Sequence, residues 1–401
     1  MLFDGVRHRQ PPRDPRERQH LDPDLYWASS GESEFQAKIR ATFTIDHYQY
    51  PPPFLILPRS LSLVTGDFLR MRALRFALGT AAFLTALAVV AVWCGAARSN
   101  PELLVLPLLV AAPATLATLQ IGNFQLMAIS LAMLGMVAFE RKHDWLGGLL
   151  LGFSMLSKVF PGILLVYLIL QRRWRPVIWT AGASLAILVV TLSLFGAGPV
   201  RDFVTFQVPR IASGDVFAFF TKAKVPRTVM ANTALFGLPY KLEGLGLTGF
   251  DSYRVAQVLT HADTLGLAVL LVLLARARRA LRAEAASGVR TGPGSPLREA
   301  QTWLALLTLA QLRSPFLPWT YGIIATMWLL LLVLPRTRHR IWKTALVGVA
   351  WVLLAVNVPF RFGPDSYPFH LGFTFVGVLG ILLFNLTVVT DRIRHPDPPP
   401  G

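Results

Sequence analysis

Long runs of apolar residues, separated by short polar or basic loops, fill the sequence from residue 51 onward. An α-helix needs roughly 20 apolar residues to cross a bilayer. Six runs come close to that length, at residues 76–97, 121–139, 176–195, 256–275, 342–359 and 371–390. Shorter or interrupted runs lie at 51–69, 103–119, 145–157, 159–171, 301–313 and 319–334. The pattern predicts an all-α polytopic membrane helical bundle of roughly nine to twelve crossings, with outer-face loops and short interfacial helices.

The basic loops predict which ends of these helices face the cytoplasm. Lys and Arg gather at 140–143, 171–175, 276–298 and 336–343, and again at the C-terminal end. Cytoplasmic loops of membrane proteins carry such an excess. Residues 145–170 and 301–334 then form two hairpins that turn outward, at Lys158 to Pro161 and at Arg313 to Pro318. The stretches 196–255 and 360–370 also face outward. The parity of 51–119 stays open, and at least one of 51–69 and 103–119 is a candidate re-entrant segment.

Composition supports the membrane interpretation and removes two other classes. The chain has 401 residues, of which 53% are hydrophobic and 15% charged, against roughly 25% charged residues in soluble domains. An ordinary water-soluble enzyme is therefore excluded. The net charge of +17 comes from the loops of the membrane part, so it gives no support for nucleic-acid binding. The single cysteine excludes an intrachain disulfide and a cysteine metal cluster.

The polar segment of residues 1–50 contains no apolar run suited to a membrane anchor, and it carries the first candidate site residues. Asp22 and Asp24 stand beside Tyr26, and Tyr50 follows at the first membrane entry. A carboxylate of this kind suits a general base acting on a hydroxyl, and aromatic faces suit sugar rings. The alternative is a solvated loop with a helix-capping aspartate and an interfacial aromatic belt.

Three amides, Gln120, Asn123 and Gln125, surround Gly122 between two apolar runs. Buried amides require hydrogen-bond partners, so the amides are candidates for lining a cavity. Contact between close-packed membrane helices is the other interpretation.

Lys158 interrupts an apolar stretch, where a central lysine costs about 2.5 to 3.5 kcal/mol. A lipid phosphate or pyrophosphate would compensate its charge, and Arg313 at the other outward turn offers a second cation. Snorkelling of the lysine to the interface is the alternative.

The outer stretch 227–242, which includes Asn232, has the amphipathic pattern of a segment lying on the membrane surface. Metal-ligand spacing, a P-loop, a dinucleotide fingerprint and a Gly-x-Ser-x-Gly elbow are all missing from the sequence. No metal and no cofactor is therefore predicted, and ATP-driven transport is disfavoured.

Several motifs occur in one order along residues 22–390. They are Gln120-Ile121-Gly122-Asn123, Gly147-Gly148 through Phe153, Lys158 with Pro161, and Tyr167 through Arg175. In their order and spacing they resemble glycosyltransferase family 87 of the GT-C superfamily, the polyprenyl-phosphate-mannose-dependent α-mannosyltransferases. Tyr50-Pro51-Pro52, the stretch from Asn232 to Gly237, and Ser314-Pro315 followed by Trp319 are similar to further family features.

The resemblance implies an integral membrane hexosyltransferase that moves a hexose, mannose in the family, from a polyprenyl phosphate to a cell-envelope glycan or glycolipid with inversion. The family's catalytic aspartate falls on Asp22, with Asp24 as the alternate. The other implied roles are donor phosphate and sugar binding by Lys158, Arg313, Gln120 and Asn123, and an acceptor groove bordered by Tyr26, Tyr50 and Asn232.

The implied organisation has three parts. Residues 1–50 form a polar outer segment with the catalytic acid, residues 51–390 the transmembrane bundle, and residues 391–401 a basic, Pro-rich cytoplasmic tail. The protein is expected in the cell membrane with its active face extracytoplasmic, and its expected partners are membrane lipid and the two substrates.

The sequence departs from the family pattern in two places. The helix expected before the catalytic aspartate is absent, which predicts a late-called start or a fragment. Paired histidines after the Ser-Pro turn are replaced by Thr320-Tyr321-Gly322, which leaves the acceptor and the sugar open.

A lipid-linked sugar flippase or secondary transporter remains the alternative function, because it also needs intramembrane lysine and amides. Internal repeats, which transporters often show, are not evident. A structural membrane scaffold is the third possibility, but it has no evident use for outward acids, amides and cations.

Overall fold

The computed structural model describes residues 50–96, 99–213, 224, 226–286, 295–337, 339–355 and 367–394. The described residues are almost entirely helical, and their only extended pairing is an isolated bridge between Asn232 and Pro318. The all-α membrane bundle predicted from the sequence is confirmed.

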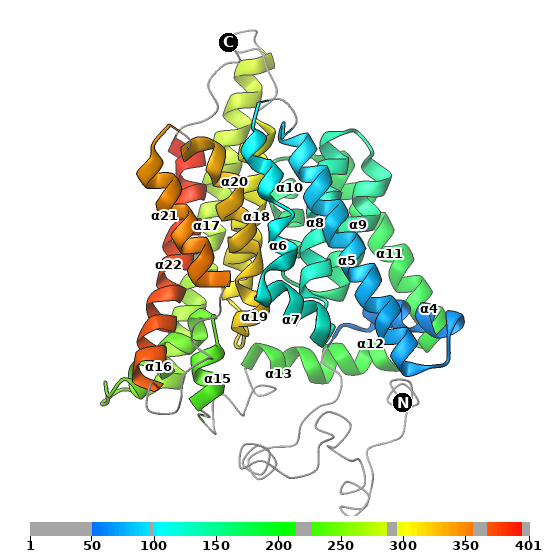
Figure 1. Ribbon diagram of the computed structural model, residues 1–401. Helices are drawn as coiled ribbons and strands as arrows, with labels where there is room; N and C mark the ends of the chain where they lie inside the picture. Colours follow the sequence, from blue (N-terminus) through cyan, green and yellow to red (C-terminus); the bar gives the residue numbers. More distant parts are fainter. Residues whose placement is uncertain are drawn as a thin grey trace, which may run out of the picture.

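Helices run up and down between two ends of the molecule (Figure 1). The first part of the chain consists of η1 (Pro52–Leu55), α4 (Ile56–Val64), α5 (Phe68–Trp93), η2 (Pro101–Val105), α6 (Leu108–Ala111), α7 (Pro113–Ile121), α8 (Gln125–Glu140), α9 (Asp144–Ser157), α10 (Gly162–Leu170) and α11 (Trp174–Phe195). A group of short helices follows: α12 (Gly198–Asp202), η3 (Phe203–Gln207), α13 (Val208–Ser213), α15 (Pro226–Ala231), η5 (Leu235–Gly237) and α16 (Leu238–Gly244). The last part consists of α17 (Ser252–Ala286), α18 (Pro296–Leu312), α19 (Trp319–Gly322), α20 (Ile324–Thr337), α21 (Ile341–Ala355) and α22 (Tyr367–Arg394).

We call the end of the bundle that carries α4, α7, α12, α13, α16 and α19 the Tyr50 face, and the other end the opposite face (Figure 1). Helix α5 leaves the Tyr50 face and α7 returns to it. The helices η2–α6 and α7 together form a span that bends by 50° at the break before Pro113. The segment before α5 stays at the Tyr50 face. In the structure, the segment 103–119 thus runs from the opposite face to the Tyr50 face, whereas 51–69 stays at the Tyr50 face (Figure 1).

Five described helices are long and apolar enough to span a membrane, and the bent pair makes a sixth candidate. Four of them, α5, α11, α17 and α22, fall on runs predicted as spans. Helices α8 and α21, also predicted, have only 16 and 15 described residues. The fifth candidate, Trp319–Thr337, was predicted only as a short piece; it is 72% buried within the bundle.

Both predicted hairpins are present. Helix α9 ends at Ser157 and α10 begins at Gly162, while α18 ends at Leu312 and α19 begins at Trp319. Helix α18 is central, since almost all of its side chains are buried, and Trp303 stacks on Trp93 of α5 with ring centroids 5.1 Å apart. The α18 arm of the second hairpin is therefore anchored in a packed core.

At the opposite face, buried charges join the last helices. Glu299 of α18 pairs with Arg278 of α17 and, at 2.7 Å, with Arg392 of α22, and both Glu299 and Arg392 are buried. Breaking such a pair leaves an unpaired buried charge, which costs about 3 to 5 kcal/mol. This cluster fixes the register of three helices far from the Tyr50 face.

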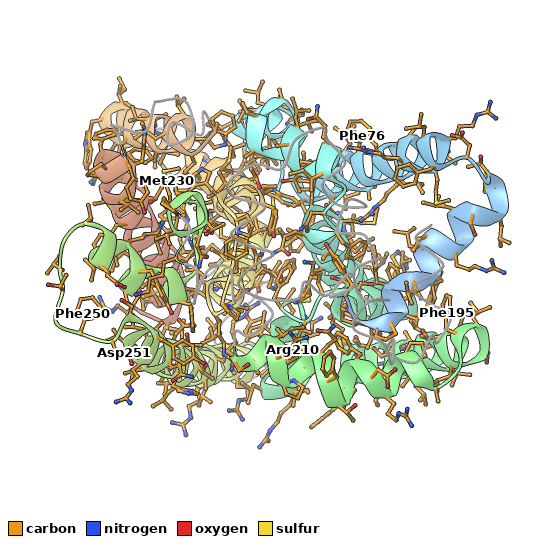
Figure 2. All side chains as sticks on the ribbon, turned by 90° about the horizontal axis from the view of Figure 1, so that it is seen from below. Phe76, Phe195, Arg210, Met230, Phe250 and Asp251 are labelled. Carbon is orange, nitrogen blue, oxygen red and sulfur yellow. The ribbon has the colours of Figure 1, made fainter. Side chains whose placement is uncertain are left out.

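The stretch 227–242 differs from its predicted position. Residues 232–241 are all buried instead of lying on the membrane surface. Their burial follows from contacts of α16 with α17 and α22, and of η5 with α17. The segment that instead runs along the edge of the Tyr50 face is α12–η3–α13, from Phe195 to beyond Arg210 (Figure 2).

Candidate functional site

The turn between α7 and α8 brings two predicted site residues to the Tyr50 face. Helix α7 ends at Ile121 and is capped by Gly122, whose φ of +72° is left-handed and favours glycine. The Gly122 N–H donates to the carbonyls of Thr118 and Leu119, both at 3.1 Å. The Asn123 Oδ1 accepts the Gln125 N–H at 2.8 Å, which closes an Asx-turn just before α8. The side chain of Asn123 is also hydrogen-bonded to Tyr321. The turn is thus rigid, with Gln120 exposed and Asn123 partly buried.

Two arginines of α5 approach this turn, and sequence analysis missed both. Arg72 and Arg75 lie one helical turn apart and so share a face. The Arg72 Nη2 donates to the Gln120 carbonyl at 2.9 Å. The Arg75 guanidinium would lie 3.5 Å from a Cβ placed on Gly122. In the sequence they resemble ordinary interfacial charge ahead of a span, so only the three-dimensional contact distinguishes them.

Lys158 lies at the end of α9 in extended conformation, and its amine faces an aromatic ring. The Nζ is 4.5 Å from the centroid of the Tyr50 ring, within cation–π range. No ion pair of Lys158 with a described carboxylate is found within 4.0 Å, and its side chain is only partly buried. Among the described residues, no carboxylate therefore neutralises its charge.

The Tyr50 ring links the lysine to the arginines. It stacks on Phe54 with centroids 4.7 Å apart, and the Arg75 guanidinium lies 5.3 Å from the Phe54 centroid. The Tyr50 hydroxyl accepts a long hydrogen bond of 3.5 Å from the Phe124 N–H. Tyr50, Asn123 and Lys158, predicted separately, therefore share one cluster. We call Tyr50, Phe54, Arg75, Asn123 and Lys158 the Tyr50 cluster.

Arg313 lies elsewhere among the described contacts. Its Nε donates to Thr264 Oγ1 of α17 at 2.6 Å, and no described interaction joins it to Lys158. In the stacked pair of Tyr50 and Phe54, Lys158 lies over the Tyr50 ring and Arg75 over the Phe54 ring. The second cation at this pair is therefore Arg75 and not Arg313. The assignment of Arg313 to the donor phosphate remains a prediction.

Asn232 has both ends of its amide engaged by backbone. The Nδ2 donates to the Pro315 carbonyl at 3.0 Å, and the Oδ1 accepts the N–H groups of Leu317 and Ala234, each at 2.9 Å. The side chain is fully buried. It therefore holds the 315–318 turn in place, and any effect on an acceptor groove passes through that turn.

Asp22, Asp24 and Tyr26 lie outside the described residues, and the described chain begins at Tyr50 within the cluster. Within the described part, no group of three or more His, Cys, Asp or Glu side chains is placed to hold a metal. The described cluster offers cations, amides and aromatic faces. It can bind an anion and a sugar ring, and it needs a base from outside itself for acid–base chemistry.

Comparison with known proteins agrees with this chemistry. The profile described as glycosyltransferase family 87 matches residues 48–292, more than half of the chain. The match includes all five residues of the Tyr50 cluster and begins after Asp22 and Asp24. Neither a curated protein nor a solved structure matches significantly. Given the match, the membrane helices and the cluster, the chain belongs to glycosyltransferase family 87.

Proposed function

We propose that this glycosyltransferase takes a hexose from a polyprenyl phosphate sugar and passes it, with inversion, to a cell-envelope glycan or glycolipid. The observation that carries the proposal is the position of Lys158. Its amine lies on the Tyr50 ring beside the α7–α8 turn, at the membrane end of a bundle, with no described carboxylate paired to it. A lipid phosphate at the interface is the anion that such a cation suits.

The proposed reaction is a single displacement. Asp22, or Asp24 in its place, removes the proton of the acceptor hydroxyl, and the acceptor oxygen attacks the anomeric carbon from the side opposite the phosphate. The bond from that carbon to the phosphate oxygen breaks, and the phosphate leaves with the lipid. Lys158 and Arg75 stabilise the charge that develops on it. Asn123 and Gln120 hydrogen-bond the sugar, and Tyr50 and Tyr26 border the acceptor.

We also propose that the Tyr50 face is extracytoplasmic in the cell membrane. The opposite face gathers Arg141, Lys142, Arg172 and Arg173 in the turns of the first half, and Arg336 and Arg340 in the second half. Cytoplasmic loops carry such an excess of positive charge. Donor and acceptor then meet outside the cytoplasm.

The test of the donor site compares Lys158→Ala and Arg75→Gln with Arg70→Gln, an exposed arginine on the same helix as Arg75. With labelled polyprenyl phosphate mannose and isolated membranes, each of the first two changes should raise the KM for donor by about tenfold or more, because a charge-assisted contact worth about 1.5 to 3 kcal/mol is lost. Arg70→Gln should leave KM unchanged. If the KM for donor were the same in all three variants, Lys158 and Arg75 would not bind the donor phosphate.

The test of the base uses Asp22→Asn, Asp24→Asn and the double variant. Loss of the general base should lower kcat about 100-fold or more while donor binding persists. Full transfer by the double variant would show that the base lies elsewhere.

A further inference from the structure

The ends of α20 and α22 and the start of α18 meet at the opposite face, where two arginines share one carboxylate (Figure 1). Asp391 of α22 accepts Arg298 of α18 at 3.0 Å and Arg336 of α20 at 3.4 Å. Both guanidinium groups approach the same oxygen, Oδ2. Because Asp391 carries a single negative charge, it does not neutralise both arginines.

The deeper layer of this junction does not supply the missing negative charge. The buried Glu299 also accepts two arginines, Arg278 and Arg392, on one oxygen, Oε1. Arg336 lies close enough to Arg298 and Arg392 for their like charges to act on it. In the described ion pairs of the junction, two carboxylates therefore serve four arginines. An anion from outside the chain would relieve this repulsion.

Arg336 is the member of the junction that a ligand reaches most easily. Its side chain is 32% exposed, against 13% for Arg298 and 2% for Arg392. Arg394 follows one helical turn after Asp391 on α22 and is also exposed. The outer rim of the junction thus presents guanidinium groups to the surroundings of the protein.

An apolar surface leads along α22 to this rim. Val376 and Leu383 are 67% and 62% exposed, and both lie on the same face of the helix as Arg394. Helix α22 is long and apolar enough to span a membrane, so an exposed apolar face on it contacts acyl chains. A lipid whose chain lies on this face has its headgroup at the level of the arginines.

We propose that Arg336, Arg298 and Arg394, around Asp391, bind the phosphate of an anionic phospholipid in the leaflet at the opposite face. Guanidinium groups suit phosphate because they form charge-assisted, often bidentate, hydrogen bonds to its oxygens. Basic pockets between transmembrane helices bind anionic headgroups in this way. The apolar face of α22 favours a lipid over soluble phosphate. The site is separate from the Tyr50 cluster, and the inference does not depend on the proposed function.

The test measures the thermal midpoint of the purified full chain in detergent while phosphatidylglycerol is added. The lipid should raise the midpoint, because it binds the folded protein. Arg336→Gln should weaken the apparent affinity about tenfold, since a charge-assisted contact is lost. Phosphatidylcholine with the same acyl chains and inorganic phosphate should each produce a much smaller shift than phosphatidylglycerol.

Two further variants control for folding and for general charge. Arg394→Gln at the end of α22 leaves the Asp391 ion pairs in place and should also weaken binding. Arg141→Gln removes an exposed charge from the α8–α9 turn at the same face and should bind like the wild type. Native mass spectrometry gives a second measurement: Arg336→Gln should retain fewer phosphatidylglycerol molecules than Arg141→Gln.

Three results would overturn the inference: an affinity unchanged in both Arg336→Gln and Arg394→Gln, an equal loss in Arg141→Gln, or equal stabilisation by phosphatidylcholine. A shift with inorganic phosphate as large as that with phosphatidylglycerol would overturn the lipid as the occupant and show that the junction takes a soluble anion. None of these measurements involves sugar transfer, so such a failure would leave the proposed function intact.

Discussion

The Lys241 amine is completely buried near the Tyr50 face and donates to three neutral oxygens. They are the carbonyls of Val229 and Met230, at 2.8 and 2.7 Å, and Thr374 Oγ1 at 2.9 Å. Desolvation by burial lowers the pKa of Lys241 from 10.5 to about 7. Lys241 therefore links α15, α16 and α22, although burial disfavours the charged form of its amine.

This shift predicts a rise in stability with pH. Between pH 7 and 10.5 the unfolded chain keeps the proton on Lys241 and the folded protein loses it, so unfolding must take up a proton. The thermal midpoint of the detergent-solubilised protein should therefore rise between pH 7 and 9.5, with a full effect near 1.4 kcal/mol per unit of pKa difference. Lys241→Met should flatten that slope. Parallel slopes in the two proteins would contradict the prediction.

For single residues, the sequence predicted Lys158 in the hairpin turn and the amides Gln120 and Asn123 beside Gly122, because polar groups within apolar runs are easy to recognise. It did not reveal Arg75, whose approach to Gly122 depends on how α5 crosses the α7–α8 turn. Nor did it reveal that the Asn232 amide is engaged by the 315–318 turn. Such contacts join residues far apart in sequence, and periodicity within one helix contains no information about them.

Among the helices, α9 and α11 form the closest pair of the first half, because glycines let their backbones approach. The sequence predicted these helices and the hairpin that includes α9. It left open whether 103–119 is a crossing or a re-entrant segment, since a bend at Pro113 is compatible with a broken span or a re-entrant loop. Only the position of α8 after the turn decides between them.

The α9–α11 contact predicts a strong effect of one methyl group. Gly148→Ala places a Cβ about 2.5 Å from the Trp179 backbone, so the helices must separate. We expect a loss of stability of about 1 to 3 kcal/mol, typical of overpacking. Gly182→Ala on α11, with nothing within 4 Å, is the matched control. Thermal unfolding in one detergent compares them, and equal midpoints would refute a tight contact at Gly148.

In the molecule as a whole, the order of the helices determines which turns lie together at the Tyr50 face and which at the opposite face. The Arg201 side chain at the Tyr50 face and Arg340 near the opposite face are both exposed. The native Cys94 is 3% exposed, so it should react little. In intact cells, a membrane-impermeant maleimide should label Arg201→Cys and leave Arg340→Cys unlabelled until the membrane is opened. The reverse pattern would place the Tyr50 face in the cytoplasm.

Asn232 has a consequence for how the protein is made. Its amide is satisfied by backbone groups of residues 315 and 317, more than eighty positions later in the chain. Thr233 likewise donates to the Leu317 carbonyl. While the ribosome is still delivering the last helices, the Asn232 amide lacks the backbone partners that it has in the finished structure. This end of the bundle therefore reaches its final packing only after α18 and the turn beyond it have been synthesised.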